Sequence, residues 1–183
     1  MREVQGWIVV DVVEEAVRKA KAIRTARSHL YDNPNSKPSA WFWVGDLGEV
    51  YVDRWLRYEG VCDYEWFVND PVGKPDFQVG PVSVDVKTVK RQRPPHADYS
   101  AHVRADQIGH EFDQYFFCCY SISTNEMWLL GGITRPEFLA QARLYHRGEW
   151  VHQHYQVPDE LYNIGLGCLK RPRDWLLNLV LPP

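Results

Sequence analysis

Hydrophobic and polar residues recur along the chain with two different periods, which predict helices in some stretches and strands in others. Apolar side chains at helical spacing over residues 9–30 predict an amphipathic helix whose far end is rich in Arg and Lys. Those charges suit the C-terminal end of a helix facing solvent, and contact with DNA is the alternative interpretation. A second helix is predicted over residues 41–58, where Gly60 supplies a left-handed cap.

Short runs rich in Val, Phe and Tyr predict the strands. Three such runs follow the second helix, over residues 61–68, 75–79 and 82–89. Two more lie over residues 112–122 and 126–133, and the first of these is apolar enough for the centre of a sheet. The connection between the two groups is interrupted by prolines, and within it we predict a short helix near residues 100–108.

The chain after the last predicted strand contains one strong helix signal. Thr134 and Glu137 form a capping box with Pro136 in the first turn, which predicts a helix continuing through FLAQARLY. The remaining residues are predicted to be irregular, apart from a last helix near residues 173–180.

These elements predict an α+β or mixed α/β fold, in which a central mixed sheet of four to five strands is flanked by helices. We expect one domain over residues 1–183. Its core is predicted over about residues 41–130, preceded by the helix over 9–30 and followed by a C-terminal helix and tail over 134–183.

The composition of the chain says more about where the protein works than about what it does. The formal charge of −3 excludes a generally basic nucleic-acid coat, although it permits local basic patches. The four cysteines include no CxxC pair, and Cys118-Cys119 lies in an apolar run typical of buried thiols, which favours a reducing cytoplasm. No stretch approaches the roughly 18 to 20 apolar residues that span a bilayer, so we expect no membrane partner.

The stretch KPDFQVGPVSVDVKT, residues 74–88, predicts a hairpin that turns at Gly80-Pro81. Pairing about this turn sets Asp76 opposite Asp85. Because side chains alternate along a strand, the Val and Phe residues then share one face, and Asp76, Asp85 and Lys87 share the other.

Two carboxylates that face each other on a sheet repel, and a divalent cation between them removes that objection. Asp76, Asp85 and the backbone carbonyl of Val86 would form an all-oxygen site of the kind that Mg²⁺ or Mn²⁺ prefers. Lys87 would then stabilise charge on a phosphate or orient an attacking water. The alternative is that Lys87 only neutralises two surface acids as an ion pair.

The dipeptide Pro75-Asp76, followed by Asp85-Val86-Lys87, resembles the signature of the PD-(D/E)XK nuclease superfamily, in which a preceding helix usually adds a glutamate. Glu49 matches that element, with Asp46, Asp53 and Glu59 as competitors; Gly45 and Gly48 beside it would let the helix approach the sheet. The resemblance implies a restriction-endonuclease-like core and a compact phage-type member. It also implies hydrolysis of DNA with Mg²⁺, or Mn²⁺ in its place, by metal-activated water. The catalytic residues it implies are Glu49, Asp76, Asp85 and Lys87, the first three as metal ligands.

A basic strip follows Lys87, and we predict that it contacts DNA through Lys90, Arg91, Arg93 and Arg104. The basic or Gln residue that often follows the family motif has the candidates His102, Arg104 and Gln107. Tyr99, Trp41 and Trp43 can stack on bases, and packing at the start of a helix is the alternative for the two tryptophans.

Several alternatives stay open at this point. A non-catalytic DNA-binding or interaction module that keeps the nuclease fold is the main rival to an enzyme, and the motif can also arise by coincidence. The protein can also form a homodimer, and a phage-encoded protein would be located in the host cytoplasm. His152 and His154 have strand-like ligand spacing but no third partner nearby, and we interpret them as a surface pair.

Overall fold

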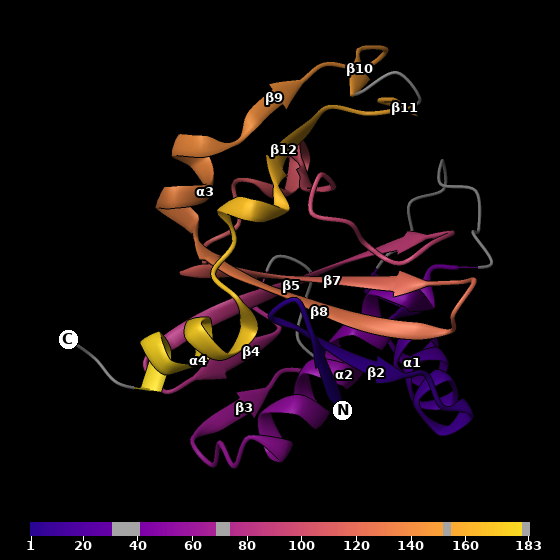
Figure 1. Cartoon of the computed structure of the whole chain (residues 1–183), viewed down its shortest axis with the longest axis vertical. Coiled ribbons are helices and arrows are strands. Elements are labelled where there is room, and N and C mark those ends of the chain that lie inside the picture. The colour runs from indigo at the N-terminus through magenta and orange to yellow at the C-terminus, as the bar shows by residue number, and fades with distance from the viewer. Residues whose placement is uncertain (31–40, 69–73, 152–154, 181–183) are drawn as a thin grey trace.

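The structure, a computed structural model, describes residues 1–30, 41–68, 74–151 and 155–180 (Figure 1). In these ranges the chain forms an α+β fold with four α-helices and a mixed sheet of seven strands, more than the four to five predicted. The helices are α1 (Glu14–Ala26), α2 (Trp43–Tyr58), α3 (Arg135–Gln141) and α4 (Pro172–Val180). The strands of the main sheet, in spatial order, are β1 (Arg2–Val4), β2 (Trp7–Asp11), β8 (Glu126–Thr134), β7 (Gln114–Ser121), β5 (Val82–Arg91), β4 (Phe77–Val79) and β3 (Tyr64–Trp66).

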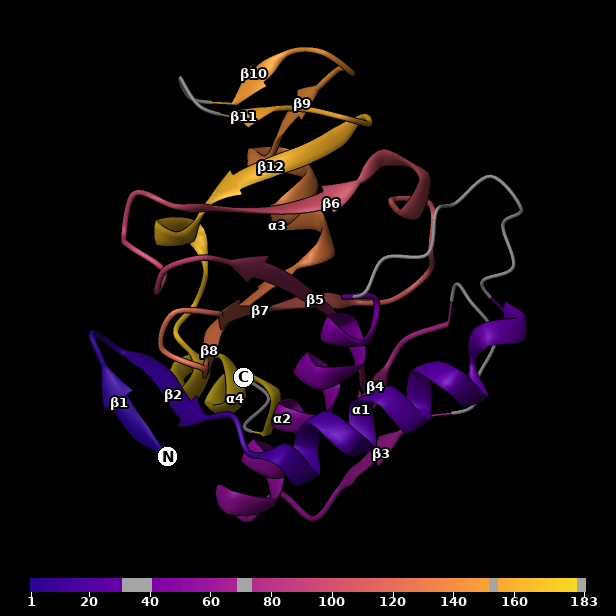
Figure 2. The same ribbon diagram turned by 90° about the vertical axis from the view of Figure 1, so that its right-hand side faces the viewer.

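A second, three-stranded sheet stands above the main one, with helices α1 and α2 on the opposite side (Figure 2). Its order is β6 (Ser100–Arg104), β12 (Leu161–Gly165) and β9 (Arg143–Tyr145), and β10 (Trp150–Val151) pairs with β11 (Tyr155–Gln156) beside it. The main sheet therefore has a hydrophobic core on each face. Trp55 of α2 and Trp175 of α4 pack on Phe116 in one core, and Tyr115 packs on Phe138 of α3 in the other.

The central position predicted for the strand over residues 112–122 is confirmed, because β7 lies fourth of the seven strands and is buried along nearly its whole length. The helix predicted over residues 9–30 is wrong in its first part. Residues 2–11 form the hairpin β1–β2, with Gln5 and Gly6 at positive φ in the turn, and α1 begins only at Glu14. Val9 continues the helical spacing of Val12 and Ala16, but it belongs to a strand in which Trp7, Ile8 and Val9 are all buried because both faces of the strand are covered.

The helix predicted near residues 100–108 is also wrong. Ser100–Arg104 is a strand whose Ala101 and Val103 are buried, and only Ala105–Gln107 forms a short 3₁₀ turn. The capping box at Thr134 and Glu137 is confirmed, but α3 ends at Gln141 because Arg143–Tyr145 pairs with β12. The last helix is confirmed as α4, whereas strands β9 to β12 were not predicted.

The hairpin predicted about Gly80-Pro81 is confirmed, with Val79 paired to Val82 and Phe77 to Val84. Gly80 occupies the turn at φ +53°, in the left-handed region. Strand β5 continues well beyond its partner β4 and pairs in parallel with β7 over eight positions. Among the described residues, no helix is both long enough and apolar enough to cross a membrane.

Helix α2 meets β5 at Gly48. A Cβ at Gly48 would overlap the Thr88 hydroxyl and lie 3.0 Å from the Thr88 Cβ, whereas a Cβ at Gly45 would meet only Arg24 Nη2, at 3.6 Å. Of the two glycines expected to allow close approach, Gly48 is thus the one that does so. This contact sets the depth at which α2, and with it Glu49, lies on the sheet.

We predict that Gly48→Ala lowers the free energy of unfolding by about 1–3 kcal/mol, because the added methyl group overpacks the α2–β5 contact. The matched control Gly45→Ala should leave it unchanged or raise it by up to about 1 kcal/mol through helix propensity. Urea denaturation of both variants is the measurement. Equal effects of the two substitutions would contradict the close approach at Gly48.

Candidate active site

Asp76 lies one residue before β4. It binds the edge of β5 just beyond the first residue pair of the β4–β5 ladder. Its backbone N–H donates to the Val84 carbonyl at 2.9 Å, and its Oδ2 accepts the Val86 N–H at 2.7 Å. The ladder therefore stops at the pair Phe77–Val84, and Asp76 is not placed directly across the ladder from Asp85 as we had expected. Since the N–H and C=O of one strand residue point the same way, the Val86 carbonyl also points toward this edge.

Asp85 and Lys87 lie on the same face of β5, as the alternation predicts. The Lys87 Nζ is 2.7 Å from the Asp85 Oδ2, and the Asp85 residue is buried. This is the face toward the second sheet, since Val89, two residues further along, packs in the core that contains Ala101 and Val103. Lys87 and Asp85 thus form an ion pair. The pair is compatible with both roles considered for Lys87, neutralisation of an acid and contact with a phosphate.

Glu49 reaches the same region from α2, on the other side of the sheet. It is buried, and both of its oxygens are held by Arg27, with Nη1–Oε1 at 2.8 Å and Nη2–Oε2 at 2.9 Å. The indole N–H of Trp66 also donates to Oε2 at 3.0 Å. Of its competitors, Asp46 is bound by Arg24 and Arg27, and Asp53 by Arg57 and Tyr64.

Arg27 is the residue of this site that the sequence interpretation missed. It is 5% exposed, and besides Glu49 it binds Asp46 at 3.0 Å and the carbonyls of Val68 and Phe67. It was counted among the solvent-facing charges at the end of the first helix. A signal was nevertheless present, because the buried residues Ala16, Ala20 and Ile23 of α1 extend at helical spacing to position 27.

The charges of these groups act on one another. Burial raises the pKa of Asp76 well above its usual value, and the nearby charges of Glu49 and Asp85 raise it further, against the opposing effects of Lys87 and the Val86 N–H. Burial also raises the pKa of Glu49, although Arg27 opposes the rise. Asp76 therefore lies within the electrostatic influence of Glu49, Asp85 and Lys87, while Arg27 and Lys87 are the counter-charges of Glu49 and Asp85.

The donor chemistry of this cluster suits a hard cation, but its geometry in the structure is that of an ion-pair network. Among the described residues, no group of three or more His, Cys, Asp or Glu is arranged to hold a metal ion. Asp76, Asp85 and the Val86 carbonyl are the oxygen donors that fit Mg²⁺ or Mn²⁺. Glu49 can join them directly only if Arg27 releases one of its oxygens, and otherwise through water.

The residues after Lys87 line two adjoining hollows. A pocket of about 180 Å³ brings Lys87 together with His102, Arg104 and Gln107, the three candidates for the basic or Gln position. Lys90, Arg91 and Arg93, three of the predicted DNA contacts, line a larger cavity of about 700 Å³. The fourth, Arg104, forms an ion pair with Asp106 at 2.7 Å.

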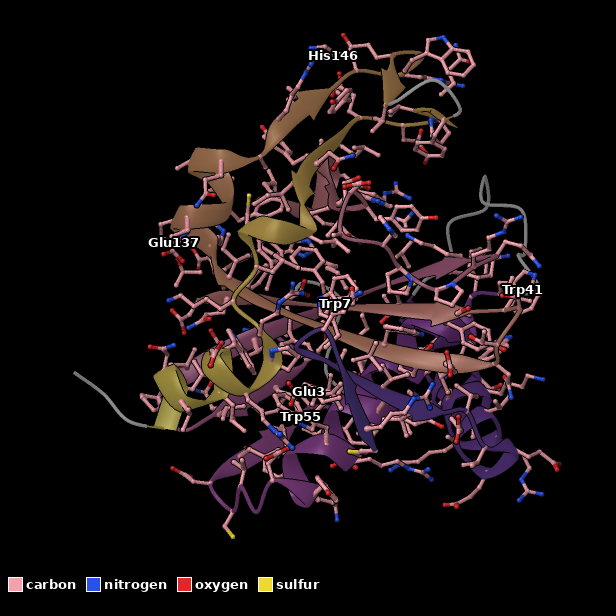
Figure 3. All side chains as sticks on the ribbon, in the orientation of Figure 1. Glu3, Trp7, Trp41, Trp55, Glu137 and His146 are labelled. Carbon is pink, nitrogen blue, oxygen red and sulfur yellow. The ribbon has the colours of Figure 1, made fainter. Side chains whose placement is uncertain are left out.

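The other predicted features are placed as follows. Trp41 stacks on Trp43 with ring centroids 5.8 Å apart, and both contact Tyr120 near the end of the sheet, while Trp41 remains partly exposed (Figure 3). Packing at the start of α2 therefore accounts for Trp43, whereas Trp41 is exposed and lies under the Lys90 ammonium at 4.2 Å. Cys118 and Cys119 are buried free thiols, as expected. His152 and His154 lie outside the described residues.

Comparison with known proteins gives no relative. No family model, no curated protein and no solved structure matches the chain.

We predict that Arg27→Met lowers the free energy of unfolding by about 3–5 kcal/mol, because it leaves the Glu49 and Asp46 carboxylates buried without their cation. Adding Glu49→Gln to this variant should recover part of the loss. Arg57→Ala, which breaks a more exposed pair with Asp53, should cost only about 0–1 kcal/mol. Urea denaturation checks all three, and a loss at Arg27 no larger than at Arg57 would contradict the network.

The raised pKa of Asp76 predicts a pH dependence of stability in metal-free buffer. The native state disfavours the ionised carboxylate, so this contribution to stability is complete below the ordinary Asp pKa of about 3.9 and is lost as the pH rises through the raised value. Asp76→Asn should therefore raise the free energy of unfolding by at least about 1 kcal/mol at about pH 8, and by less at about pH 4. The exposed control Asp159→Asn should show no such trend, and a wild-type advantage that grows with pH would refute the prediction.

Proposed function

We propose that the protein is a nuclease that uses Mg²⁺ or Mn²⁺ to hydrolyse DNA phosphodiester bonds, with Glu49, Asp76, Asp85 and Lys87 at its active site. The observation that carries the proposal is that the charges of Glu49, Asp85 and Lys87 all act on the buried carboxylate of Asp76. Glu49 comes from α2, Asp76 from the residue before β4, and Asp85 and Lys87 from β5. The charges of Glu49 and Asp85 act on Asp76, which makes the cluster a place where a cation is favoured.

The order of the elements supports the same reading. Helix α2 is followed by the antiparallel strands β3, β4 and β5, and the chain then crosses over to β7, which is parallel to β5. This order resembles the one expected for a restriction-endonuclease-like core, and it departs from that core in the crossover, where β6 and a 3₁₀ turn replace the expected helix. The extra strands β8, β2 and β1 extend the sheet beyond the four strands of such a core.

Each residue has a role that follows from its position. Asp76, Asp85 and the Val86 carbonyl would hold the cation, and Glu49 would add an oxygen directly or through water. A bound divalent cation would lower the pKa of water and neutralise charge on the scissile phosphate. Lys87 would place its ammonium beside the phosphate, where it can orient the attacking water and offset developing negative charge. Arg27 positions Glu49 by binding both of its oxygens.

A non-catalytic nucleic-acid-binding module is the second candidate, and one observation favours it. Arg27 and Lys87 already neutralise Glu49 and Asp85, so two of the three carboxylates are compensated without any metal. Such a module would keep the fold and its basic cavity, but would use the charged cluster only to hold α1, α2 and β5 together.

Cleavage assays distinguish these candidates. The purified protein is incubated with linear, circular, single-stranded and branched DNA, in Mg²⁺, Mn²⁺ or EDTA. We predict cleavage that depends on the metal, is abolished by Asp76→Ala and falls at least about 100-fold in Lys87→Ala. The exposed matched controls Asp159→Ala and Lys170→Ala should cleave at the wild-type rate.

Two outcomes would contradict the proposal. Unchanged cleavage in Asp76→Ala and Lys87→Ala would remove the active-site assignment. Absence of cleavage on every DNA, together with retained DNA binding, would favour the non-catalytic module.

A further inference from the structure

The larger of the two hollows lies between the end of β5 and the second sheet. It has a volume of about 700 Å³. Its wall on the β5 side comes from residues 89–93, and its opposite wall from β6, β10, β11 and β12. The lining residues are Val89, Lys90, Arg91, Gln92, Arg93, Tyr99, Ser100, His102, Val151, Tyr155 and Asn163.

The lining of this cavity carries positive charge. Lys90, Arg91 and Arg93 line it, and of the described residues that form its wall none is an Asp or Glu, although the chain as a whole carries −3. Arg91 is held in place by a hydrogen bond from Nη2 to the Ser100 carbonyl at 2.6 Å, and its guanidinium lies 4.6 Å from the centre of the Tyr99 ring. A cavity with this lining attracts an anion.

The cavity continues from the proposed active site. Asp85, Lys87, Val89 and Arg91 follow one another on the same face of β5, because side chains alternate along a strand. Val89 and His102 line both this cavity and the smaller pocket at Lys87, so the two hollows adjoin. From Lys87 to Arg91 the strand rises about 13 Å.

The size and the aromatic residues of the cavity select a single strand. Its volume falls in the range of about 300–1,000 Å³ typical of sites for drug-sized ligands, which is enough for a few nucleotides and not for a duplex. Tyr99 and the half-exposed Tyr155 present rings on which bases can stack. His102 and Asn163 are cross-strand neighbours on β6 and β12, and both offer polar groups to the same space.

We propose that this cavity binds a few nucleotides of single-stranded nucleic acid and leads the strand to Lys87. The phosphates lie along Arg91 and Arg93, and the bases stack on Tyr99 and Tyr155. This inference rests on the proposed function in so far as it delivers a strand to the nuclease site, but binding by the cavity needs neither metal nor cleavage.

The test is a binding measurement on full-length Asp76→Asn protein in EDTA, where hydrolysis cannot occur. Fluorescence anisotropy follows labelled oligothymidylate and oligouridylate of about ten nucleotides, and a blunt duplex of the same length, at several salt concentrations. We expect the single strands to bind at least about tenfold more tightly than the duplex. The logarithm of the binding constant should fall with the logarithm of salt with a slope of about −1.4 for two phosphate contacts. The DNA and RNA arms show whether the 2′-hydroxyl is accepted.

Variants of the cavity locate the binding. Arg93→Ala should reduce the salt slope by about 0.7, and Tyr155→Ala should weaken binding about tenfold through the loss of one stacked base. Tyr155→Phe, which keeps the ring, should bind like the parent protein. The charge control Arg18→Ala, on the exposed side of α1, should leave both the affinity and the slope unchanged.

Binding of the duplex as tight as that of the single strands, or equal effects of Arg93→Ala and Arg18→Ala, would overturn this inference. Those results would leave the nuclease proposal intact if wild-type protein cleaved duplex DNA with Mg²⁺. Conversely, single-strand binding that depends on Arg93 and Tyr155, in a wild-type protein that cleaves nothing, would support this inference and reject the nuclease.

Discussion

The rest of the site depends on the buried ion pair between Arg27 and Glu49. Removing two charges from water costs several kcal/mol for each ion, and only good geometry with further hydrogen bonds offsets that cost. Arg27 meets this condition through a bidentate ion pair with Glu49, a hydrogen bond to Asp46 and two hydrogen bonds to the backbone carbonyls that follow β3. One guanidinium thereby joins α1, α2 and residues 67–68, directly after β3.

The balance of charge around this pair is the physical basis for proposing a divalent cation at the cluster. Arg27 and Lys87 supply two positive charges against the three carboxylates Glu49, Asp76 and Asp85, so one negative charge is left over. Burial raises the pKa of Asp76, and the charges of Glu49 and Asp85 raise it further, so a proton or a cation that neutralises Asp76 is favoured. A divalent cation would turn the surplus into one positive charge, which matches the single negative charge of a phosphodiester.

The sequence carried enough information for the hairpin, and much less for the parts that surround it. The turn at Gly80, the two faces of β5 and the capping box at Thr134 depend on neighbours in the chain, so local pattern predicted them. Strands β2 and β6 are short, and their partners, β8 and β12, lie more than 50 residues away in the chain. Local periodicity does not detect such distant pairing. Arg27 was missed for a related reason, since its partners Glu49 and Val68 come from elements folded against α1.

The most direct test of the account is calorimetric titration of Mn²⁺ and Mg²⁺ into the protein without nucleic acid. We expect saturable binding of a divalent cation to the wild type, with protons released as Asp76 ionises. Binding should be lost in Asp85→Asn and retained in Asp46→Asn, because Asp46 is already held by Arg24 and Arg27. Binding of equal strength in the wild type and in Asp85→Asn, or no binding to the wild type, would contradict the claim that these carboxylates form a cation site.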